Sequence, residues 1–226
     1  MKKERIEITQ AGFSKKVNQD YCVSTENLAA VFDGCGSAEH SEVGAKRMGE
    51  AIRKNSRNIT SKEELRNTIS DVFYDILLED LSDEEFGDKY LFTILVCIEK
   101  DDSYEVYNAG DGFIITIDSS DRIRYIQINN NILIKNGNAP QYIAYNYMFE
   151  TLHIDHVFLR RRPFKKTDYK SVYVATDGLR FVLSDRFPKQ ERKAFEKALI
   201  DRDEQSIREI LKRNSKKIFD DIAIAF

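Results

Sequence analysis

The order of strand-like and helix-like segments most restricts the fold of this chain. A first group of β-favouring apolar runs precedes two amphipathic segments with helical spacing, which start near Ser41 and after Ser61. A second group precedes helical segments at 191–199 and 204–211, and an apolar run at 222–226 closes the sequence. Because strands and helices are grouped and do not alternate, this order disfavours a doubly wound parallel sheet. It favours an antiparallel, layered α+β fold.

The strand predictions rest on apolar runs bounded by turn residues. Glu26 and Asn27 form a predicted tight turn between the second and third runs. The four central runs are separated by segments of turn composition, which predicts an antiparallel meander. The region 129–170 shows no clear period and receives no assignment. The predicted strands are 5–9, 21–25, 28–32, 91–99, 103–109, 113–118, 122–128, 171–176 and 222–226.

Composition excludes several classes of protein. With 42% hydrophobic and 32% charged residues, the chain is too apolar for disorder and too charged for a membrane bundle. Its 35 basic and 38 acidic residues give a net charge of −3, which argues against nucleic-acid binding. Its 226 residues, without a repeat or linker, predict one domain over 1–226.

Targeting signals and cysteine pairs are also missing from the sequence. No apolar run approaches the roughly 20 residues that span a bilayer, so we expect no membrane partner. Cys22, Cys35 and Cys97 are odd in number and far apart, which predicts neither a disulfide framework nor a zinc site. A reducing cytoplasm is the expected compartment.

Four aspartates stand at the ends of apolar runs. Asp33, Asp111 and Asp177 each precede a glycine, and Asp220 opens the last predicted strand. One Asp-Gly pair alone is an ordinary turn. Several carboxylates aimed from strand ends toward one place would instead form a hard oxygen site for magnesium or manganese.

These residues resemble the metal-dependent protein phosphatases of type 2C, in particular their short bacterial and archaeal members. That family has two antiparallel sheets packed face to face with antiparallel helix pairs outside, a four-layer αββα sandwich that agrees with the predicted element order. The motifs that carry the resemblance are Asn18-Gln19-Asp20, Asp33-Gly34-Cys35-Gly36, Ser41 to Ala45, Phe92-Thr93, Gly110-Asp111-Gly112, Asn138 to Tyr142, Ala175 to Gly178 and Asp220-Asp221.

The resemblance implies two bound magnesium or manganese ions. Asp33 would bridge them, Gly34 would offer its backbone carbonyl to one, and Asp177 and Asp220 would ligate the other. Asp20 would hold water at the site. Asp20, Asp33, Asp177 and Asp220 are therefore the expected catalytic residues.

Two further roles follow from the resemblance. Asp111, together with Asp177, matches a third and weaker metal position. Lys15 or Lys16 stands where the family has a phosphate-binding arginine, and a lysine cannot make the planar two-pronged contact of a guanidinium. Lys15 and Lys16 are therefore the two candidates for the substrate-binding residue.

The implied function is a serine/threonine protein phosphatase, in which a water bridging two metal ions attacks a phosphomonoester. Its expected partners are phosphoprotein substrates, namely a Ser/Thr kinase or its targets. Two alternatives stay open. One is a phosphatase-like module with weak or no catalysis that binds a kinase or phosphoprotein, and the other is a two-metal phosphodiesterase.

Overall fold

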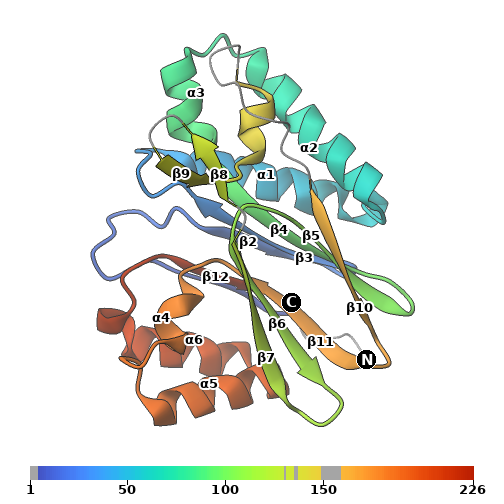
Figure 1. Cartoon of the computed structure of the whole chain (residues 1–226), viewed down its shortest axis with the longest axis vertical. Coiled ribbons are helices and arrows are strands. Elements are labelled where there is room, and N and C mark those ends of the chain that lie inside the picture. Colours follow the sequence, from blue (N-terminus) through green and yellow to red (C-terminus); the bar gives the residue numbers. More distant parts are fainter. Residues whose placement is uncertain (1–4, 130, 135–136, 149–158) are drawn as a thin grey trace.

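Two five-stranded antiparallel sheets form the centre of the molecule (Figure 1). The computed structural model describes residues 5–129, 131–134, 137–148 and 159–226. Sheet A contains, in spatial order, β1 (Glu7–Gln10), β12 (Ile222–Ala225), β11 (Tyr169–Ala175), β6 (Gly112–Asp118) and β7 (Ile123–Ile128). Sheet B contains β10 (Arg160–Lys165), β5 (Ser103–Ala109), β4 (Phe92–Glu99), β3 (Leu28–Gly34) and β2 (Tyr21–Ser24). A separate hairpin pairs β8 (Asn131–Ile134) with β9 (Gly137–Pro140).

Helices cover the outer face of each sheet (Figure 1). In the described part of the chain, no helix is long and apolar enough to cross a membrane. The helices against sheet B are α1 (Ser41–Asn55), α2 (Lys62–Leu77) and α3 (Asp83–Tyr90). Those against sheet A are α4 (Leu179–Leu183), α5 (Lys189–Asp201) and α6 (Glu204–Arg213).

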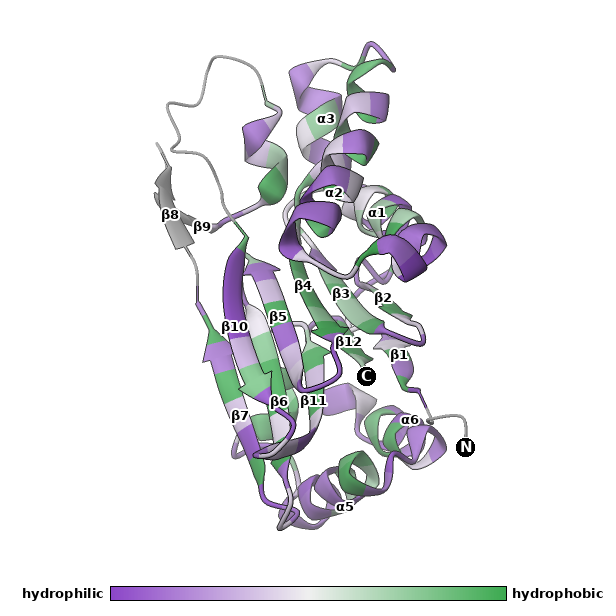
Figure 2. Ribbon diagram, turned by 90° about the vertical axis from the view of Figure 1, so that its right-hand side faces the viewer, coloured by the Kyte–Doolittle hydropathy of each residue, from purple (hydrophilic) through white to green (hydrophobic). Residues whose placement is uncertain are grey.

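Three apolar cores hold these four layers together. One lies between sheet B and its helices, one between sheet A and its helices, and one between the two sheets. The central core includes Val31 and Leu95 of sheet B and Val174 of sheet A. Strands buried on both faces carry little polar surface, as Figure 2 shows for β3 and β4. The predicted α+β sandwich of two face-to-face antiparallel sheets is therefore confirmed.

The predicted four-strand meander is wrong in one respect. β4 and β5 pair in sheet B, whereas β6 and β7 pair in sheet A. The chain changes sheets at Gly110-Asp111-Gly112, where the two glycines have φ values of +94° and +136°. Turn composition shows that the chain reverses there, but it does not say whether the next strand joins the same sheet.

Helix boundaries follow local capping signals. The Ser61 hydroxyl accepts a hydrogen bond from the Glu64 amide at 3.3 Å, which starts α2 as predicted. α3 has no counterpart among the predicted helices, although Ser82 and Glu85 form a complete capping box at its start. That signal was available in the sequence.

The unassigned region 129–170 contains an edge strand. β10 pairs with β5 along its whole length, and four of its first five side chains are exposed. Its apolar alternation is weak because an edge strand with one solvated face needs little apolar surface. His153 and His156 lie outside the described residues.

Candidate active site

The sheets bring the strand-end aspartates to one edge of the sandwich. Asp33 is the last residue but one of β3, and Asp20 directly precedes β2, which pairs antiparallel with β3. Asp177 follows β11, and Asp220 precedes β12, which pairs antiparallel with β11. Asp111 lies in the turn that links the two sheets. In each antiparallel pair the end of one strand lies beside the start of the next, so the five carboxylates meet there.

Burial and mutual repulsion disfavour the charged form of these aspartates. Burial is the main reason that the pKa of Asp33 is raised, and the charges of Asp20, Asp177 and Asp111 raise it further. Burial, with a smaller contribution from Asp177, raises the pKa of Asp111 to about 6. The site is therefore short of positive charge.

A hydrogen bond from Thr176 orients the carboxyl group of Asp20. The Thr176 hydroxyl donates to Asp20 Oδ2 at 2.6 Å and accepts from the Ala223 amide at 2.8 Å. Burial raises the pKa of both Asp20 and Asp177. Thr176 thereby links Asp20, which precedes β2 of sheet B, to β12 of sheet A.

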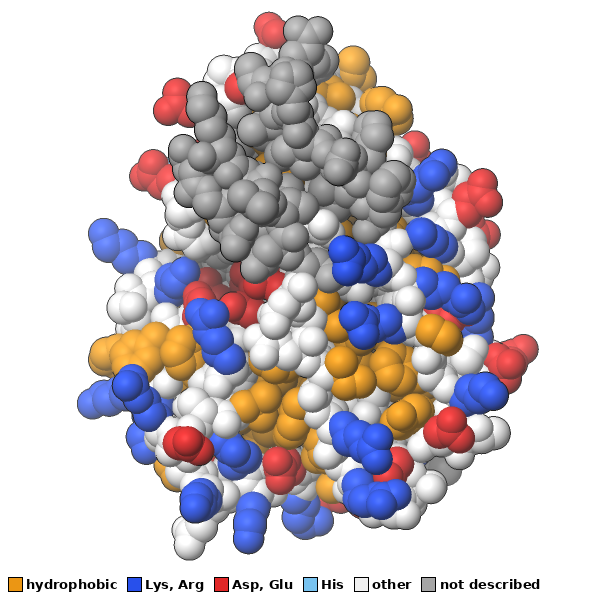
Figure 3. Space-filling view, in the orientation of Figure 1, with side chains coloured by type: hydrophobic (Ala, Val, Ile, Leu, Met, Phe, Trp, Pro, Cys, Tyr) orange, Lys and Arg blue, Asp and Glu red, His pale blue; other side chains and the backbone are white. Residues whose placement is uncertain are grey.

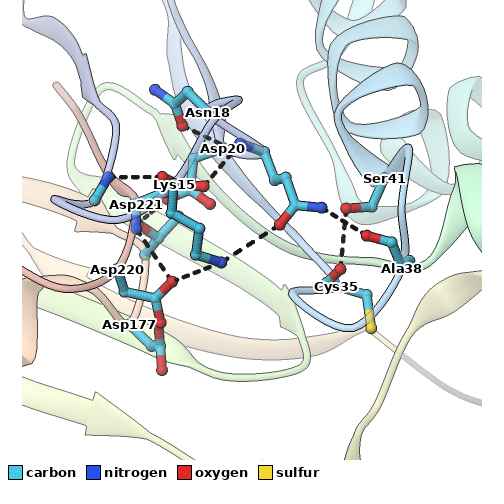
Figure 4. A network of polar contacts seen from close by, with 12 residues as sticks. Lys15, Asn18, Asp20, Cys35, Ala38, Ser41, Asp177, Asp220 and Asp221 are labelled. Atoms are coloured by element: carbon cyan, nitrogen blue, oxygen red, sulfur yellow. Dashed lines mark hydrogen bonds and ion pairs between the residues drawn. The ribbon is translucent and has the colours of Figure 1, made fainter.

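One of the two candidate lysines reaches the site. Lys15 Nζ lies 3.3 Å from Asp220 Oδ1 and 3.4 Å from Gln19 Oε1 (Figure 4). Burial opposes the charge of Lys15, but the Asp220 carboxylate outweighs it and raises the pKa of the lysine. Lys16 is exposed. The structure thus distinguishes two lysines that the sequence analysis left as equals.

Arg180 is a site residue that the sequence analysis missed. Its guanidinium Nη1 lies 2.6 Å from Asp177 Oδ2, and its Nη2 lies 2.9 Å from Asp220 Oδ2. The sequence signal was its position three residues after Asp177 at the start of a short helix. Its second contact, to a residue 40 positions away, had no local signal.

Asp221 is a second missed residue, and it orders the loop that carries Lys15. It is 3% exposed, and its two carboxylate oxygens accept the amides of Gly12 and Gln19, both at 2.8 Å. The Gln19 side chain then donates to the Ala38 carbonyl at 2.8 Å, as Figure 4 shows. The carboxylate of Asp221 is occupied by backbone donors, so its role is to position the loop.

Cys35 lies between the aspartate cluster and α1. Its thiol is 3.2 Å from the Ser37 hydroxyl. Burial opposes ionisation of this thiol, but hydrogen bonds from Ser37 and Tyr142 outweigh it and lower the pKa. The neighbouring His40 is exposed, and its Nδ1 lies 3.7 Å from Glu42 Oε1.

The donor set suits hard divalent cations. All five side chains are carboxylates, the ligands that magnesium and manganese prefer. Thr93 lies directly opposite Asp33 in the β3–β4 ladder, and its buried hydroxyl has no hydrogen-bond partner among the described residues. Cross-strand neighbours share one face of a sheet, so this hydroxyl is beside Asp33.

Among the described residues, no three of the site aspartates have carboxylate oxygens that all lie within 4.8 Å of one another. Among the residues that the structure describes, the set whose ligand atoms all lie within 4.8 Å of one another is Glu39, His40 and Asp88, on the surface. The site aspartates are close enough to raise one another's pKa, while Asp177 and Asp220 point at Arg180.

Comparison with known proteins identifies the family. The family model described as Protein phosphatase 2C matches residues 13–215. The chain therefore belongs to the protein phosphatase 2C family. A search of curated protein sequences found no match to it.

Solved structures of bacterial phosphatases share the fold. The serine/threonine phosphatase PstP/Ppp of Mycobacterium tuberculosis is 14% identical, with a TM-score of 0.65 over 98% of this chain and 96% of that one. Stp1 of Staphylococcus aureus is 17% identical, with a TM-score of 0.65 over 98% and 93% of the two chains. The PstP catalytic domain in complex with two manganese ions is 13% identical, with a TM-score of 0.64 over 98% and 95%.

Proposed function

We propose that this protein is a magnesium- or manganese-dependent phosphatase that hydrolyses phosphoserine and phosphothreonine in proteins. The observation that carries the proposal is the meeting of five aspartates from both sheets at one edge, where burial and mutual repulsion oppose their charge. Such a cluster is costly unless cations bind it. Membership of the family and the manganese bound by the PstP domain support the same assignment.

The carboxylates of the site would serve as the metal ligands. Asp33, Asp177 and Asp220, with the Gly34 carbonyl and with Asp111 at a third position, would hold the ions. Two bound ions acidify a water and neutralise the phosphoryl oxygens.

The neighbouring side chains would handle water and substrate. Asp20, oriented by Thr176, would accept a hydrogen bond from water at the site. Lys15 would attract the substrate phosphate as a point charge.

The test is hydrolysis of para-nitrophenyl phosphate and a phosphothreonine peptide with millimolar manganese. We expect Asp33→Asn to lower turnover by roughly 100-fold or more, because the bridging carboxylate loses its charge. Asp201→Asn is the matched control, since Asp201 is an exposed aspartate paired with Lys197 on α5. Equal turnover in wild type and Asp33→Asn would refute the proposal. Faster turnover of bis(para-nitrophenyl) phosphate would indicate a phosphodiesterase instead.

One observation favours a second candidate, a module that binds phosphoproteins without hydrolysing them. Arg180 and Lys15 already pair with both oxygens of Asp220. If these pairs persist at every metal concentration, Asp220 ligates no ion and the site lacks the metal pair that hydrolysis needs. Manganese-independent binding of the phosphothreonine peptide, together with no turnover, is the result that this candidate predicts.

A further inference from the structure

Arg180 connects two carboxylates that the proposed function assigns to the same ion. Its guanidinium contacts Asp177 Oδ2 at 2.6 Å and Asp220 Oδ2 at 2.9 Å. A guanidinium presents its N–H donors in a fixed plane, so one arginine can hold two carboxylates at once. Arg180 is therefore placed as a counter-ion within the aspartate cluster.

Contacts with its own chain segment and with two aromatic rings position Arg180. Its backbone amide donates to the Asp177 carbonyl at 2.9 Å. Its guanidinium carbon lies 5.0 Å from the centre of the Phe181 ring, and that ring meets Phe219 edge-on at 5.8 Å. Phe219 directly precedes Asp220, so this aromatic contact keeps Arg180 beside both of its carboxylate partners.

These contacts leave the Arg180 side chain open to solvent, so it can move away from its carboxylate partners. Its side chain is 50% exposed, so no packed layer closes over it. Figure 3 shows acidic side chains with Lys and Arg side chains beside them on the face seen in Figure 1. Ion pairs with this degree of exposure are weak, and a divalent cation can replace them.

The oxygen atoms involved make the competition direct. Lys15 pairs with Asp220 Oδ1 and Arg180 pairs with Asp220 Oδ2. Each carboxylate oxygen has a second lone pair, but a metal ion bound to Asp220 would stand close to both protein cations. Repulsion between these like charges opposes metal binding unless the cations move away. Asp177 Oδ2 is occupied by Arg180 in the same way.

We propose that Arg180 competes with the divalent metal ion for Asp177 and Asp220, and so sets the metal concentration at which the site fills. This inference rests on the proposed function, because that function assigns both aspartates to the metal. It makes Arg180 a regulator of metal loading. A site with this arginine fills at a higher metal concentration than the same site without it.

The experiment measures manganese binding to substrate-free, full-length protein by titration calorimetry. Arg180→Gln keeps a planar group near Phe181 but removes the charge, and we expect it to bind manganese roughly tenfold more tightly than wild type. Arg180→Lys keeps one charge but cannot span both carboxylates, so its affinity should fall between the two. The matched control is Arg122→Gln, because Arg122 pairs with Asp118 at 2.8 Å on a remote hairpin. Its affinity should equal that of wild type.

An affinity of Arg180→Gln equal to or weaker than that of wild type overturns the inference. If wild type also shows manganese-dependent hydrolysis, the proposed function survives that result. If neither protein binds manganese at millimolar concentration, both the inference and the proposed metal site are wrong. Thermal melts in chelator give an independent readout. Arg180→Gln should melt lower than wild type there and gain more from manganese, whereas a higher melting temperature in chelator contradicts the competition.

Discussion

At the scale of single residues, the site has more carboxylates than cationic side chains to pair with them. Five aspartates meet at one edge of the sandwich, and Lys15 and Arg180 offset part of their charge. Glu105, on β5 of sheet B, shows the opposite situation. Burial opposes its charge, but Arg161, Tyr107 and Lys100 bind it and lower its pKa to about 2. The negative charge of Glu105 is thus balanced by neighbouring donors, whereas the negative charges of the site aspartates are balanced only in part.

This imbalance predicts how stability depends on pH without metal. The pKa of Asp111 is raised from 3.8 to about 6 in the folded protein. Between these two pH values the folded state binds more protons than the unfolded chain, so the free energy of unfolding falls as pH rises. The stabilisation that protonated Asp111 gives the folded state is lost as pH rises through about 6. We expect Asp111→Asn in chelator to gain on the order of 1–3 kcal/mol over wild type at pH 7, and little at pH 4.

Urea unfolding of both proteins in chelator, from pH 4 to pH 7, measures this difference. Asp201→Asn serves as the control at an exposed aspartate, and its curve should parallel that of wild type. A constant offset between wild type and Asp111→Asn over the whole range would show that repulsion at Asp111 is not the cause.

At the scale of elements, the site depends on close contacts between strand ends. Gly178 separates Asp177 from α4, and a Cβ there would lie 1.9 Å from the Asp221 carbonyl oxygen. The φ of Gly178 is −54°, so no backbone strain requires glycine. The requirement is space, because the chain after β11 touches the chain before β12.

We therefore expect Gly178→Ala to lower the free energy of unfolding by about 1–3 kcal/mol or more, since the obstacle is backbone and cannot rotate away. Gly87→Ala in α3 is the contrasting control. A Cβ there would meet only the Met148 methyl at 3.8 Å, so the gain in helix propensity should stabilise the protein by about 1 kcal/mol. Denaturant midpoints of the two variants should move in opposite directions, and a shared direction would contradict this account.

At the scale of the whole molecule, the aspartate cluster joins the two sheets. Asp33 belongs to β3 of sheet B, and Asp177 and Asp220 flank strands of sheet A. A cation held by residues of both sheets would bind the folded state and have no comparable site in the unfolded chain. Folding and metal binding should therefore be linked.

Manganese should raise the melting temperature of the wild-type protein. At a concentration about 100 times the dissociation constant the gain is about 2.7 kcal/mol, or roughly 5–10 °C for a chain of this length. Asp33→Asn should lose most of this shift. Sodium chloride at equal ionic strength separates specific binding from screening, and a melting temperature unchanged by millimolar manganese would count against the site.

Local sequence determined much of this protein. Ser61 and Glu64 placed the start of α2, Glu26 and Asn27 placed the first hairpin, and the grouping of strands and helices predicted an antiparallel, layered α+β fold. These features are predictable because capping, turns and apolar periodicity act over a few residues. The same holds for the aspartates at strand ends, since the end of an apolar run marks each position.

Tertiary structure alone decided how these pieces meet. The change of sheet between β5 and β6, the choice of Lys15 over Lys16, and the two anchoring roles of Asp221 all depend on contacts far apart in the sequence. Arg180 is the clearest case. Its link to Asp177 spans one helical turn, whereas its link to Asp220 exists only because β11 and β12 are neighbours in sheet A. Such an ion pair has no local sequence pattern, because packing of the sheet and not chain proximity brings its partners together.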